Sequence, residues 1–397
     1  MTGLHILVGP ARAVAATETV WSLLDRGHRV TVWTHPHHRI ALGHDRRVTL
    51  ASIPDPATDL AAATDELAQL ASTADAVFPL DDFGLVLADR LRSAGTTVVG
   101  PTGSTLGLAL DKALQAETAA AAGWCVPDGI AVDEVSQLPT EAPFPGAMVL
   151  RPARVVERLE DRLAKSDSVF CRGPHAWDDA RRAFPPERPV LVQRIVPGDG
   201  IGVFGLAHDG TLCAASGHRR VRPTDPAGSG ASAAAARRVE ADELAQAESF
   251  VTRTGWEGIL MIEQIVRPHD GTRWFVEVNA RPWGSTALAR RRGLEYPAMA
   301  VDAALGLKVD PPPHRLEDDG TVARHLGREA VHFLMVMRGP RVPTTTSWPT
   351  RRRTAVEMLR WSRSTHWYNK QPGVARLWAT DAANTVLDRV APRPGRR

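Results

Sequence analysis

The feature that most constrains this chain is a pair of apolar, β-branched segments, residues 259–266 and 273–278, separated by Pro268-His269-Asp270-Gly271. Such runs favour strands, and a cluster of Pro, Asp and Gly favours a turn, so the pattern predicts an antiparallel hairpin. The loop length decides which side chains meet. An odd number of loop residues would place Glu263 directly opposite Glu277, whereas an even number would put them on opposite faces.

The polar residues of this hairpin have the composition of a metal and phosphate site. Side chains alternate along a strand, so Glu277, Asn279 and Arg281 are expected on one face. Two facing carboxylates, here Glu263 and Glu277, repel unless a cation lies between them. Carboxylate and amide oxygens are hard donors that favour magnesium, which commonly completes its coordination with nucleotide phosphates. Arg281 could then neutralise charge on a phosphoryl group. The alternative is the polar solvent face of an ordinary hairpin.

Bulk composition sets the general class of the protein. A chain of 397 residues is too long for one core and fits two or three domains. With 48 Lys plus Arg against 45 Asp plus Glu, the charge is too balanced to indicate a nucleic-acid partner. Cys125, Cys171 and Cys213 lack metal spacing and predict free thiols in the cytoplasm. The sequence contains neither a signal-peptide pattern nor an apolar run long enough for a membrane span, so no membrane role is expected.

Residues 1–104 alternate short apolar runs with helical patterns. This order is typical of βαβ units and predicts an α/β region with a parallel sheet, including strands at residues 4–8, 29–33, 75–79 and 97–100. The first strand is followed by Gly9-Pro10-Ala11-Arg12, which lacks the glycines of a dinucleotide fingerprint. We therefore expect a Rossmann-like shape without its cofactor.

The remaining chain divides into residues 105–310 and 311–397. The middle region mixes strands and helices without strict alternation, which predicts an α+β fold. It begins with an Ala- and Leu-rich helix expected to contain Asp111-Lys112. The last region follows a Pro311-Pro312-Pro313 linker and carries many Arg and Trp residues, which indicates an appended domain or an embracing tail of unknown role.

With Asp111-Lys112, then the strand-turn segment Leu191-Val192-Gln193-Arg194-Ile195-Val196-Pro197-Gly198, and then the hairpin along the sequence, the chain resembles the ATP-grasp superfamily. It looks most like the carboxylate-amine ligase (predicted carboligase) branch. The resemblance covers about residues 101–300, and residues 1–100 resemble the domain that precedes ATP-grasp in that family. It implies a Rossmann-like pre-ATP-grasp domain followed by a two-lobed ATP-grasp domain. The metal motif of the family is matched by Glu263, Glu277, Asn279 and Arg281.

The resemblance implies a nucleotide site for ATP with Mg²⁺, or Mn²⁺ in its place. Lys112 would contact the nucleotide phosphates. Arg151 stands where the family has a second phosphate-contacting lysine, and residues 153–158 contain none of the glycines of the usual flexible loop. These two departures leave nucleotide binding better supported than catalysis. The adenine and ribose contacts would come from Gln193, Arg194, Val196 and Asp199.

An arginine-rich segment is similar to the family's substrate-binding segment. Arg220 and Arg222, two residues apart, are expected on one strand face, where guanidinium forks suit a carboxylate or phosphate. The loop at 228–232, Gly-Ser-Gly-Ala-Ser, would let backbone N–H groups approach an anion. A solvated basic strand with a surface loop is the alternative.

The implied function is an ATP-dependent ligase that activates a carboxylate as an acyl phosphate and joins it to an amine, forming an amide or peptide bond. Its partners would be a small carboxylate and an amine, amino acids among the candidates, and a homodimer is compatible with the resemblance. The main alternative is a nucleotide-binding ATP-grasp protein with lost or weak catalysis. A dinucleotide-dependent oxidoreductase, suggested by the βαβ start alone, would leave the hairpin unexplained.

Overall fold

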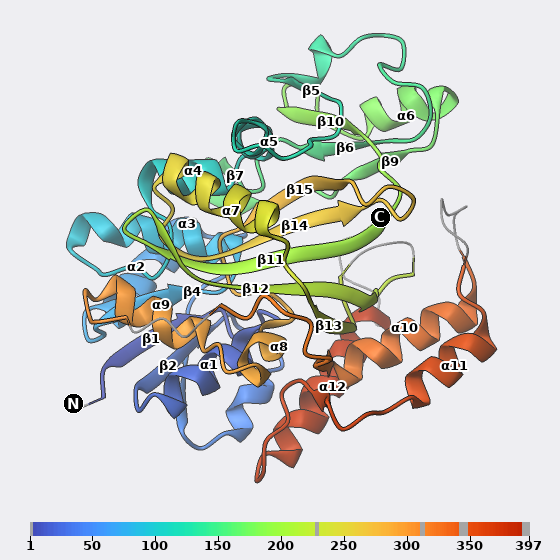
Figure 1. Ribbon diagram of the computed structural model, residues 1–397. Coiled ribbons are helices and arrows are strands. Elements are labelled where there is room, and N and C mark those ends of the chain that lie inside the picture. The colour runs from blue at the N-terminus through green and yellow to red at the C-terminus, as the bar shows by residue number, and fades with distance from the viewer. Residues whose placement is uncertain (1–2, 227–229, 310–313, 341–347, 391–397) are drawn as a thin grey trace.

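The computed structural model describes residues 3–226, 230–309, 314–340 and 348–390 as a mixed α/β protein with three main sheets (Figure 1). The expected Pro311-Pro312-Pro313 linker and the first two residues of the expected Gly-Ser loop lie outside these ranges. Within the described ranges, no helix is long and apolar enough to cross a membrane.

The N-terminal sheet is parallel, as the βαβ pattern predicts, with the strand order β3-β2-β1-β4. The predicted last strand at residues 97–100 is wrong, because this segment makes only a bridge between Val77 and Val98. The sheet and its helices comprise β1 (His5–Gly9), α1 (Ala16–Asp25), β2 (Arg29–Thr34), β3 (Val48–Ser52), α2 (Leu60–Ala71), β4 (Ala76–Pro79) and α3 (Asp82–Leu91).

The predicted single helix around Asp111-Lys112 is two helices, α4 (Gly103–Ala109) and α5 (Lys112–Ala121). Asp111 adopts an extended conformation between them, and its carboxylate accepts hydrogen bonds from the backbone N–H groups of Ala113 and Leu114. An Asp that caps a new helix satisfies donors that have no intrahelical partner. The break places Lys112 in the first turn of α5, on the side that faces the hairpin.

A smaller antiparallel sheet has the order β5-β10-β6-β9. One of its faces carries an apolar core that includes Met148, Leu150, Val190 and Val192. Because side chains alternate, Arg151, Leu191 and Gln193 point the other way, toward the large sheet. The elements of this region are β5 (Gly129–Val132), β6 (Met148–Pro152), β7 (Glu157–Leu159), β8 (Arg162–Ala164), β9 (Val169–Cys171), α6 (Trp177–Arg182) and β10 (Val190–Arg194).

The large sheet has the order β15-β14-β11-β12-β13-β16-β17. A long hairpin joins β11 and β12, which pair from Ile201 with Arg219 to His208 with Thr211. The described elements of this part are β11 (Asp199–His208), β12 (Thr211–Arg222), β13 (Ala233–Arg237), α7 (Ala241–Thr254), β14 (Gly258–Val266), β15 (Arg273–Asn279), α8 (Thr286–Arg291) and α9 (Tyr296–Ala304).

The C-terminal segment adds two strands to the large sheet and three helices beside it. Its elements are β16 (Val322–Arg324), α10 (Leu326–Arg338), α11 (Arg351–Leu359), β17 (Thr365–Trp367) and α12 (Ala375–Val390). β16 pairs with β13, and Asp388 of α12 forms an ion pair with Arg12 near the N-terminus. The segment thus contacts both the large sheet and the N-terminal region.

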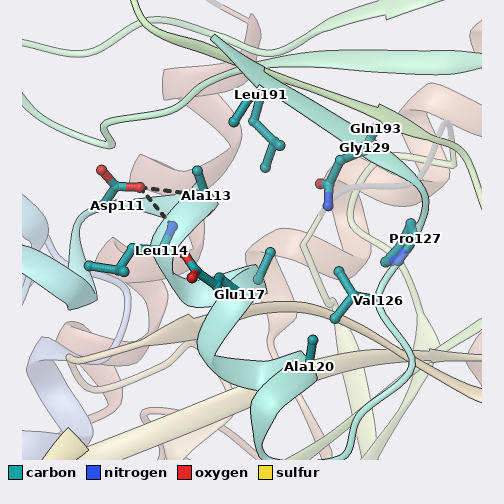
Figure 2. A pocket seen from close by; sticks show the side chains of 12 residues that line it. Asp111, Ala113, Leu114, Glu117, Ala120, Val126, Pro127, Gly129, Leu191 and Gln193 are labelled. Atoms are coloured by element: carbon teal, nitrogen blue, oxygen red, sulfur yellow. Dashed lines mark hydrogen bonds between the residues drawn. The ribbon is translucent and has the colours of Figure 1, made fainter. Parts of the chain in front are cut away.

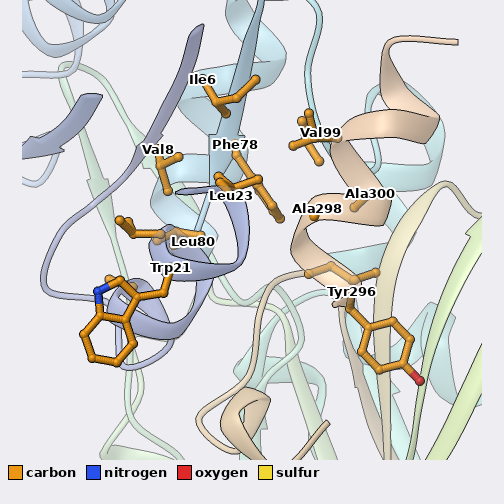
Figure 3. Packing of buried hydrophobic residues seen from close by; sticks show 14 of the residues in the cluster. Ile6, Val8, Trp21, Leu23, Phe78, Leu80, Val99, Tyr296, Ala298 and Ala300 are labelled. Carbon is orange, nitrogen blue, oxygen red and sulfur yellow. The ribbon is translucent and has the colours of Figure 1, made fainter. Parts of the chain in front are cut away.

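The N-terminal sheet and the large sheet share one apolar core (Figure 3). Ile6 and Trp21 belong to the same buried cluster as Phe204 of β11 and Tyr296 of α9. Helix α9 therefore fills the space between these two sheets. This packing fixes the carboxyl edge of the parallel sheet next to the hairpin of β14 and β15.

Candidate active site

The β14–β15 hairpin places Glu263 directly opposite Glu277, but by a route that the loop rule did not predict. Val266 pairs with Arg273, so the loop spans residues 267–272 and has an even length. A register shift next to Glu263 leaves Val276 as an extra residue on β15 and restores the pairing. Such a bulge sets two residues against one and moves the following side chains to the other face.

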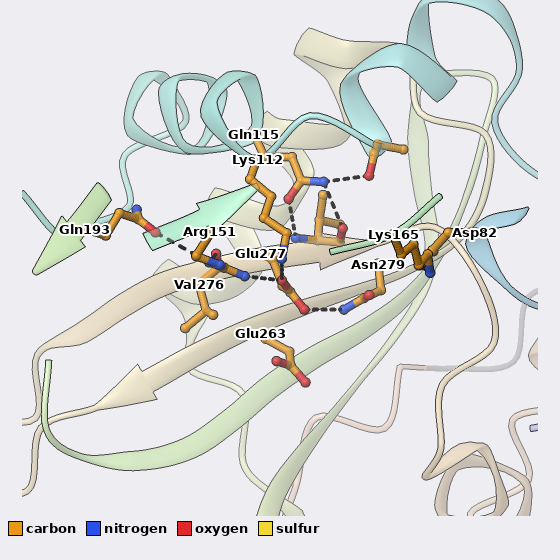
Figure 4. A network of polar contacts seen from close by, with 12 residues as sticks. Asp82, Lys112, Gln115, Arg151, Lys165, Gln193, Glu263, Val276, Glu277 and Asn279 are labelled. Carbon is orange, nitrogen blue, oxygen red and sulfur yellow. Dashed lines mark hydrogen bonds and ion pairs between the residues drawn. The ribbon is translucent and has the colours of Figure 1, made fainter. Parts of the chain in front are cut away.

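Glu277 is the centre of a polar network that joins three elements (Figure 4). Its carboxylate accepts a hydrogen bond from Nζ of Lys112 at 2.9 Å and another from the guanidinium of Arg151. Nδ2 of Asn279 lies 3.4 Å from the second carboxylate oxygen. Burial alone would raise the pKa of Glu277, but Lys112 and Arg151 outweigh it and hold this pKa far below its usual value.

Glu263 has the opposite electrostatic environment. Burial, and then the charge of Glu277, raise the pKa of Glu263 above its usual value. The guanidinium of Arg220 lies 3.9 Å away, beyond hydrogen-bond distance. The pair therefore combines an ionised carboxylate, that of Glu277, with the carboxylate of Glu263, whose ionised form a further cation nearby would stabilise. With the amide of Asn279, this donor set fits a hard divalent cation such as Mg²⁺.

Two glycines of β11, Gly200 and Gly202, leave the sheet surface between β12 and β14 without side chains. Gly202 pairs with both His218 and Glu263, which puts these two side chains on the same face of the sheet. A Cβ atom on Gly202 would lie 2.8 Å from Cε1 of His218, and one on Gly200 would lie 3.1 Å from Cζ of Arg220. His218 and Arg220 can lean across β11 toward Glu263 because neither glycine carries a side chain.

His218 is a site residue to which the sequence analysis gave no role. Its imidazole is buried against the ring of Phe204, with 4.1 Å between ring centroids, and its Nδ1 has no hydrogen-bond partner among the described residues. Burial and then the charge of Arg220 lower the pKa of His218 to about 3, so the ring is neutral at ordinary pH. The available signal was its spacing of two residues from Arg220 along one strand.

The prediction that Arg220 and Arg222 share a strand face is wrong. Arg220 pairs with Ala234 and Arg222 with Ala233, because a bulge leaves Val221 unpaired. Adjacent residues of β13 point to opposite faces, so the two arginines do as well. Arg222 is buried in an ion pair with Glu329 of α10, whereas Arg220 lies on the hairpin side.

Arg281, just beyond β15, contacts a carboxylate that the sequence analysis did not single out. Its Nε donates to Oδ1 of Asp82 at 2.7 Å, and the ammonium of Lys165 contacts the other oxygen of Asp82. Asp82 begins α3 directly after β4, at the carboxyl edge of the parallel sheet. Ligand sites in such sheets lie at this edge, and that is the signal that could have found Asp82.

The expected nucleotide residues are only partly brought together. Nη1 of Arg151 lies 3.2 Å from the carbonyl oxygen of Val276 and 3.4 Å from Oε1 of Gln193, so these residues adjoin the Glu277 network. Arg194 points the other way and pairs with Asp128 at 3.1 Å. Val196 lies in the connection after β10 and is half-buried, while Asp199, at the start of β11, is exposed.

A groove of about 570 Å³ lies beside these residues, between α5 and the inner face of the small sheet (Figure 2). Leu114 and Val126 contribute apolar walls, and Gln193 lines it from β10. Gln193 links the groove with the polar network, because it lines the groove and its Oε1 lies 3.4 Å from Nη1 of Arg151. It offers an apolar surface next to the charged residues.

The described charged residues of the site carry an excess of positive charge. Five cations accompany three carboxylates, namely Lys112, Arg151, Lys165, Arg220 and Arg281 with Asp82, Glu263 and Glu277. A buried site with this balance attracts anions, and phosphates are bound by such arrangements of Lys and Arg.

Comparison with known proteins gives matches in structure alone. No known protein family matches the sequence, and no curated protein matches it either. Among solved structures, the chain is similar to an L-amino acid ligase from Bacillus licheniformis, with a TM-score of 0.59 and 16% identity over 77% of this chain and 75% of that one. A biotin carboxylase from Campylobacter jejuni matches with a TM-score of 0.58 and 15% identity over 77% and 71%. An N5-carboxyaminoimidazole synthetase from Staphylococcus aureus matches with a TM-score of 0.58 and 12% identity over 78% and 79%.

Proposed function

The chain has the ATP-grasp fold, and from this premise we propose that it is an ATP-dependent ligase that activates a carboxylate and joins it to an amine. The observation that carries the proposal is the in-register pair of Glu263 and Glu277, with Asn279 beside them and cations around them. An ordinary structural hairpin does not need two facing, half-buried carboxylates, because they repel each other. A site for a metal–nucleotide complex does.

In this proposal Glu263, Glu277 and Asn279 hold Mg²⁺, with Mn²⁺ as a substitute. When bound, the metal supplies positive charge that neutralises the nucleotide phosphates. The residues themselves orient the site: Lys112 and Arg151 keep Glu277 ionised, and the bulge at Val276 keeps the two carboxylates in register.

The nucleotide is assigned to the space between the small sheet and the hairpin. Lys112 and Arg151 bind its phosphates, for which they are placed by their contacts with Glu277. Gln193 faces the same space. Arg194 and Val196 contribute through their backbone groups, since the Arg194 side chain points to Asp128. The carboxylate of Asp199 accepts a hydrogen bond from a ribose hydroxyl.

The substrate carboxylate is assigned to Arg220, on the hairpin side of β12, while Arg222 serves to anchor α10. A carboxylate oxygen attacks the terminal phosphorus of ATP and ADP leaves, which gives an acyl phosphate. The amine then attacks the carbonyl carbon, phosphate leaves, and the amine loses a proton to solvent. Arg281 neutralises the charge that develops on the transferred phosphoryl group.

The domain boundaries follow from the same assignment. Residues 1–104 form the Rossmann-like pre-ATP-grasp domain, residues 105–310 form the two lobes of the ATP-grasp domain, and residues 311–397 are an appended region. The small sheet is one lobe and the strands β11 to β15 of the large sheet are the other, while β16 and β17 of the appended region extend the large sheet beyond β13. A homodimer is part of the proposal, and sedimentation at several protein concentrations tests it.

The test of the function is release of ADP from ATP with pooled small carboxylates and amines, followed by mass spectrometry of the products. Amine-dependent ADP release is expected, and Glu277→Ala should abolish it with the fold retained. Glu66→Ala, which removes an exposed acid of α2, is the matched control and should leave it unchanged. Full turnover in Glu277→Ala would overturn the metal assignment.

A second candidate is a nucleotide-binding protein with lost or weak catalysis. It is favoured by Arg151, which stands where the superfamily that the sequence resembles has a lysine, because a planar guanidinium distributes its charge differently from a compact ammonium. The same assay separates the two candidates. ATP binding without amine-dependent ADP release would favour this one.

A further inference from the structure

The segment at residues 153–165 occupies the place of the missing glycine-rich loop, and the structure fixes it at both ends. At its start, the backbone N–H of Lys112 donates to the carbonyl of Ala153 at 2.8 Å, and Val155 donates to Leu110 at 2.8 Å. These bonds tie the segment to the junction of α4 and α5. Beyond Val155 the chain forms the β7–β8 hairpin.

The far end of this hairpin is anchored to the N-terminal domain. Leu163 is 1% exposed and packs in an apolar cluster with Leu60 and Leu67 of α2. The backbone N–H of Leu60 donates to Asp161 at 2.7 Å, and that of Leu163 donates to Pro56 at 2.7 Å. A buried leucine and two backbone hydrogen bonds hold a short hairpin in one position far better than a free glycine loop could be held.

Lys165 follows this hairpin and reaches the active site. Its ammonium contacts one oxygen of Asp82, while Nε of Arg281 donates to the other oxygen at 2.7 Å. One carboxylate thus holds two cations side by side. The Lys165 side chain is 41% exposed and the Asp82 side chain only 9%, so the lysine can turn toward a ligand while Asp82 stays paired with Arg281.

We propose that Lys165 binds the terminal phosphate of ATP, and that Asp82 is a positioning residue that holds Lys165 next to Arg281. This assignment rests on the proposed function. In place of a flexible glycine-rich loop over the phosphates, the chain then has the β7–β8 hairpin, which is already docked on the N-terminal domain. A cation held close to its final position loses less conformational freedom on binding, which favours affinity. A lysine suits the task because its ammonium is a compact point charge.

The test measures affinity for Mg²⁺ with a non-hydrolysable ATP analogue and, separately, with ADP, by calorimetry on the full chain. In Lys165→Met, affinity for the ATP analogue should fall about tenfold, while affinity for ADP should stay the same. Lys165→Arg should retain most of the preference for the triphosphate. Arg162→Met is the matched control, because it removes a cation from an exposed position of the same hairpin.

Asp82→Asn provides a second variant. It should reduce the preference for the triphosphate by a smaller factor, because Lys165 and Arg281 remain but are no longer held together. Equal losses for both nucleotides in Lys165→Met, or no loss for either, would overturn the assignment. So would a wild-type protein that binds ATP and ADP equally. Failure of the wild-type protein to bind either nucleotide would refute the proposed function as well.

Discussion

The two facing glutamates should respond in opposite ways to the same substitution. Glu277→Gln removes the carboxylate that Lys112 and Arg151 share, so it leaves two cations in a largely buried place. Glu263→Gln instead removes a carboxylate whose pKa is raised by burial and by the charge of Glu277. The first change therefore costs stability in the ligand-free protein, whereas the second relieves a repulsion.

The magnitude follows from exposure. The side chains are 22% exposed for Glu277, 16% for Lys112 and 11% for Arg151. Removing one partner of a buried ion pair costs about 3–5 kcal/mol, and this partial exposure places Glu277→Gln at about 3 kcal/mol. For Glu263→Gln, the free energy of unfolding should stay the same or rise. Both variants lose a metal ligand, so amine-dependent ADP release should fall by at least about 100-fold in each.

Urea unfolding of the ligand-free protein measures the first effect, and ADP release measures the second. The informative result is the combination: similar losses of activity with changes in stability of different sign or size. Equal destabilisation by both substitutions would refute the electrostatic reasoning. Unchanged ADP release in either variant would refute the role of these carboxylates as metal ligands.

Three further predictions concern the stability of the fold. Gly202→Ala should lower the free energy of unfolding by about 1–3 kcal/mol, because the new Cβ would lie 2.9 Å from a backbone oxygen of β14. Gly107→Ala, with open space around it in α4, should raise the free energy of unfolding by up to about 1 kcal/mol, and urea unfolding of both variants tests this. Glu329→Gln leaves two arginines buried and should cost about 3–5 kcal/mol, whereas Glu357→Gln, in an exposed helical pair, should change the stability little. Equal effects of the two substitutions in thermal unfolding would contradict this. Hydrogen bonds from Arg47 lower the pKa of Asp45 to about 2, so its contribution to stability is present above about pH 4 and is lost as the pH falls toward 2. Unfolding followed against pH should show a smaller loss of stability between these pH values in Asp45→Asn than in the wild type, and equal losses would contradict this.

Residue patterns predicted the elements around the site better than their junctions. The parallel N-terminal sheet and the β14–β15 hairpin follow from periodicity, which depends on local residue type. The break between α4 and α5 was missed, because Ala and Leu on both sides favour a helix and only Asp111 marks a cap. The contact of Asp82 with Arg281 joins residues far apart in sequence, and no local pattern encodes such a pairing.

The membership of the site depends on two bulges that alternation cannot reveal. If the ladder were regular at Val276, with no bulge, the even loop would put Glu263 and Glu277 on opposite faces, and the candidate metal site would not exist. If the ladder were regular at Val221, with no bulge, Arg222 would join Arg220 on the hairpin side. The bulge at Val276 thus brings one carboxylate into the site. The bulge at Val221 turns the guanidinium of Arg222 away from the site, so that it pairs with Glu329 of α10 instead. Arg222→Gln, which removes the guanidinium that pairs with Glu329, should therefore loosen α10 before it disturbs the carboxylate pair, and hydrogen exchange of α10 compared with β15 would reveal that order.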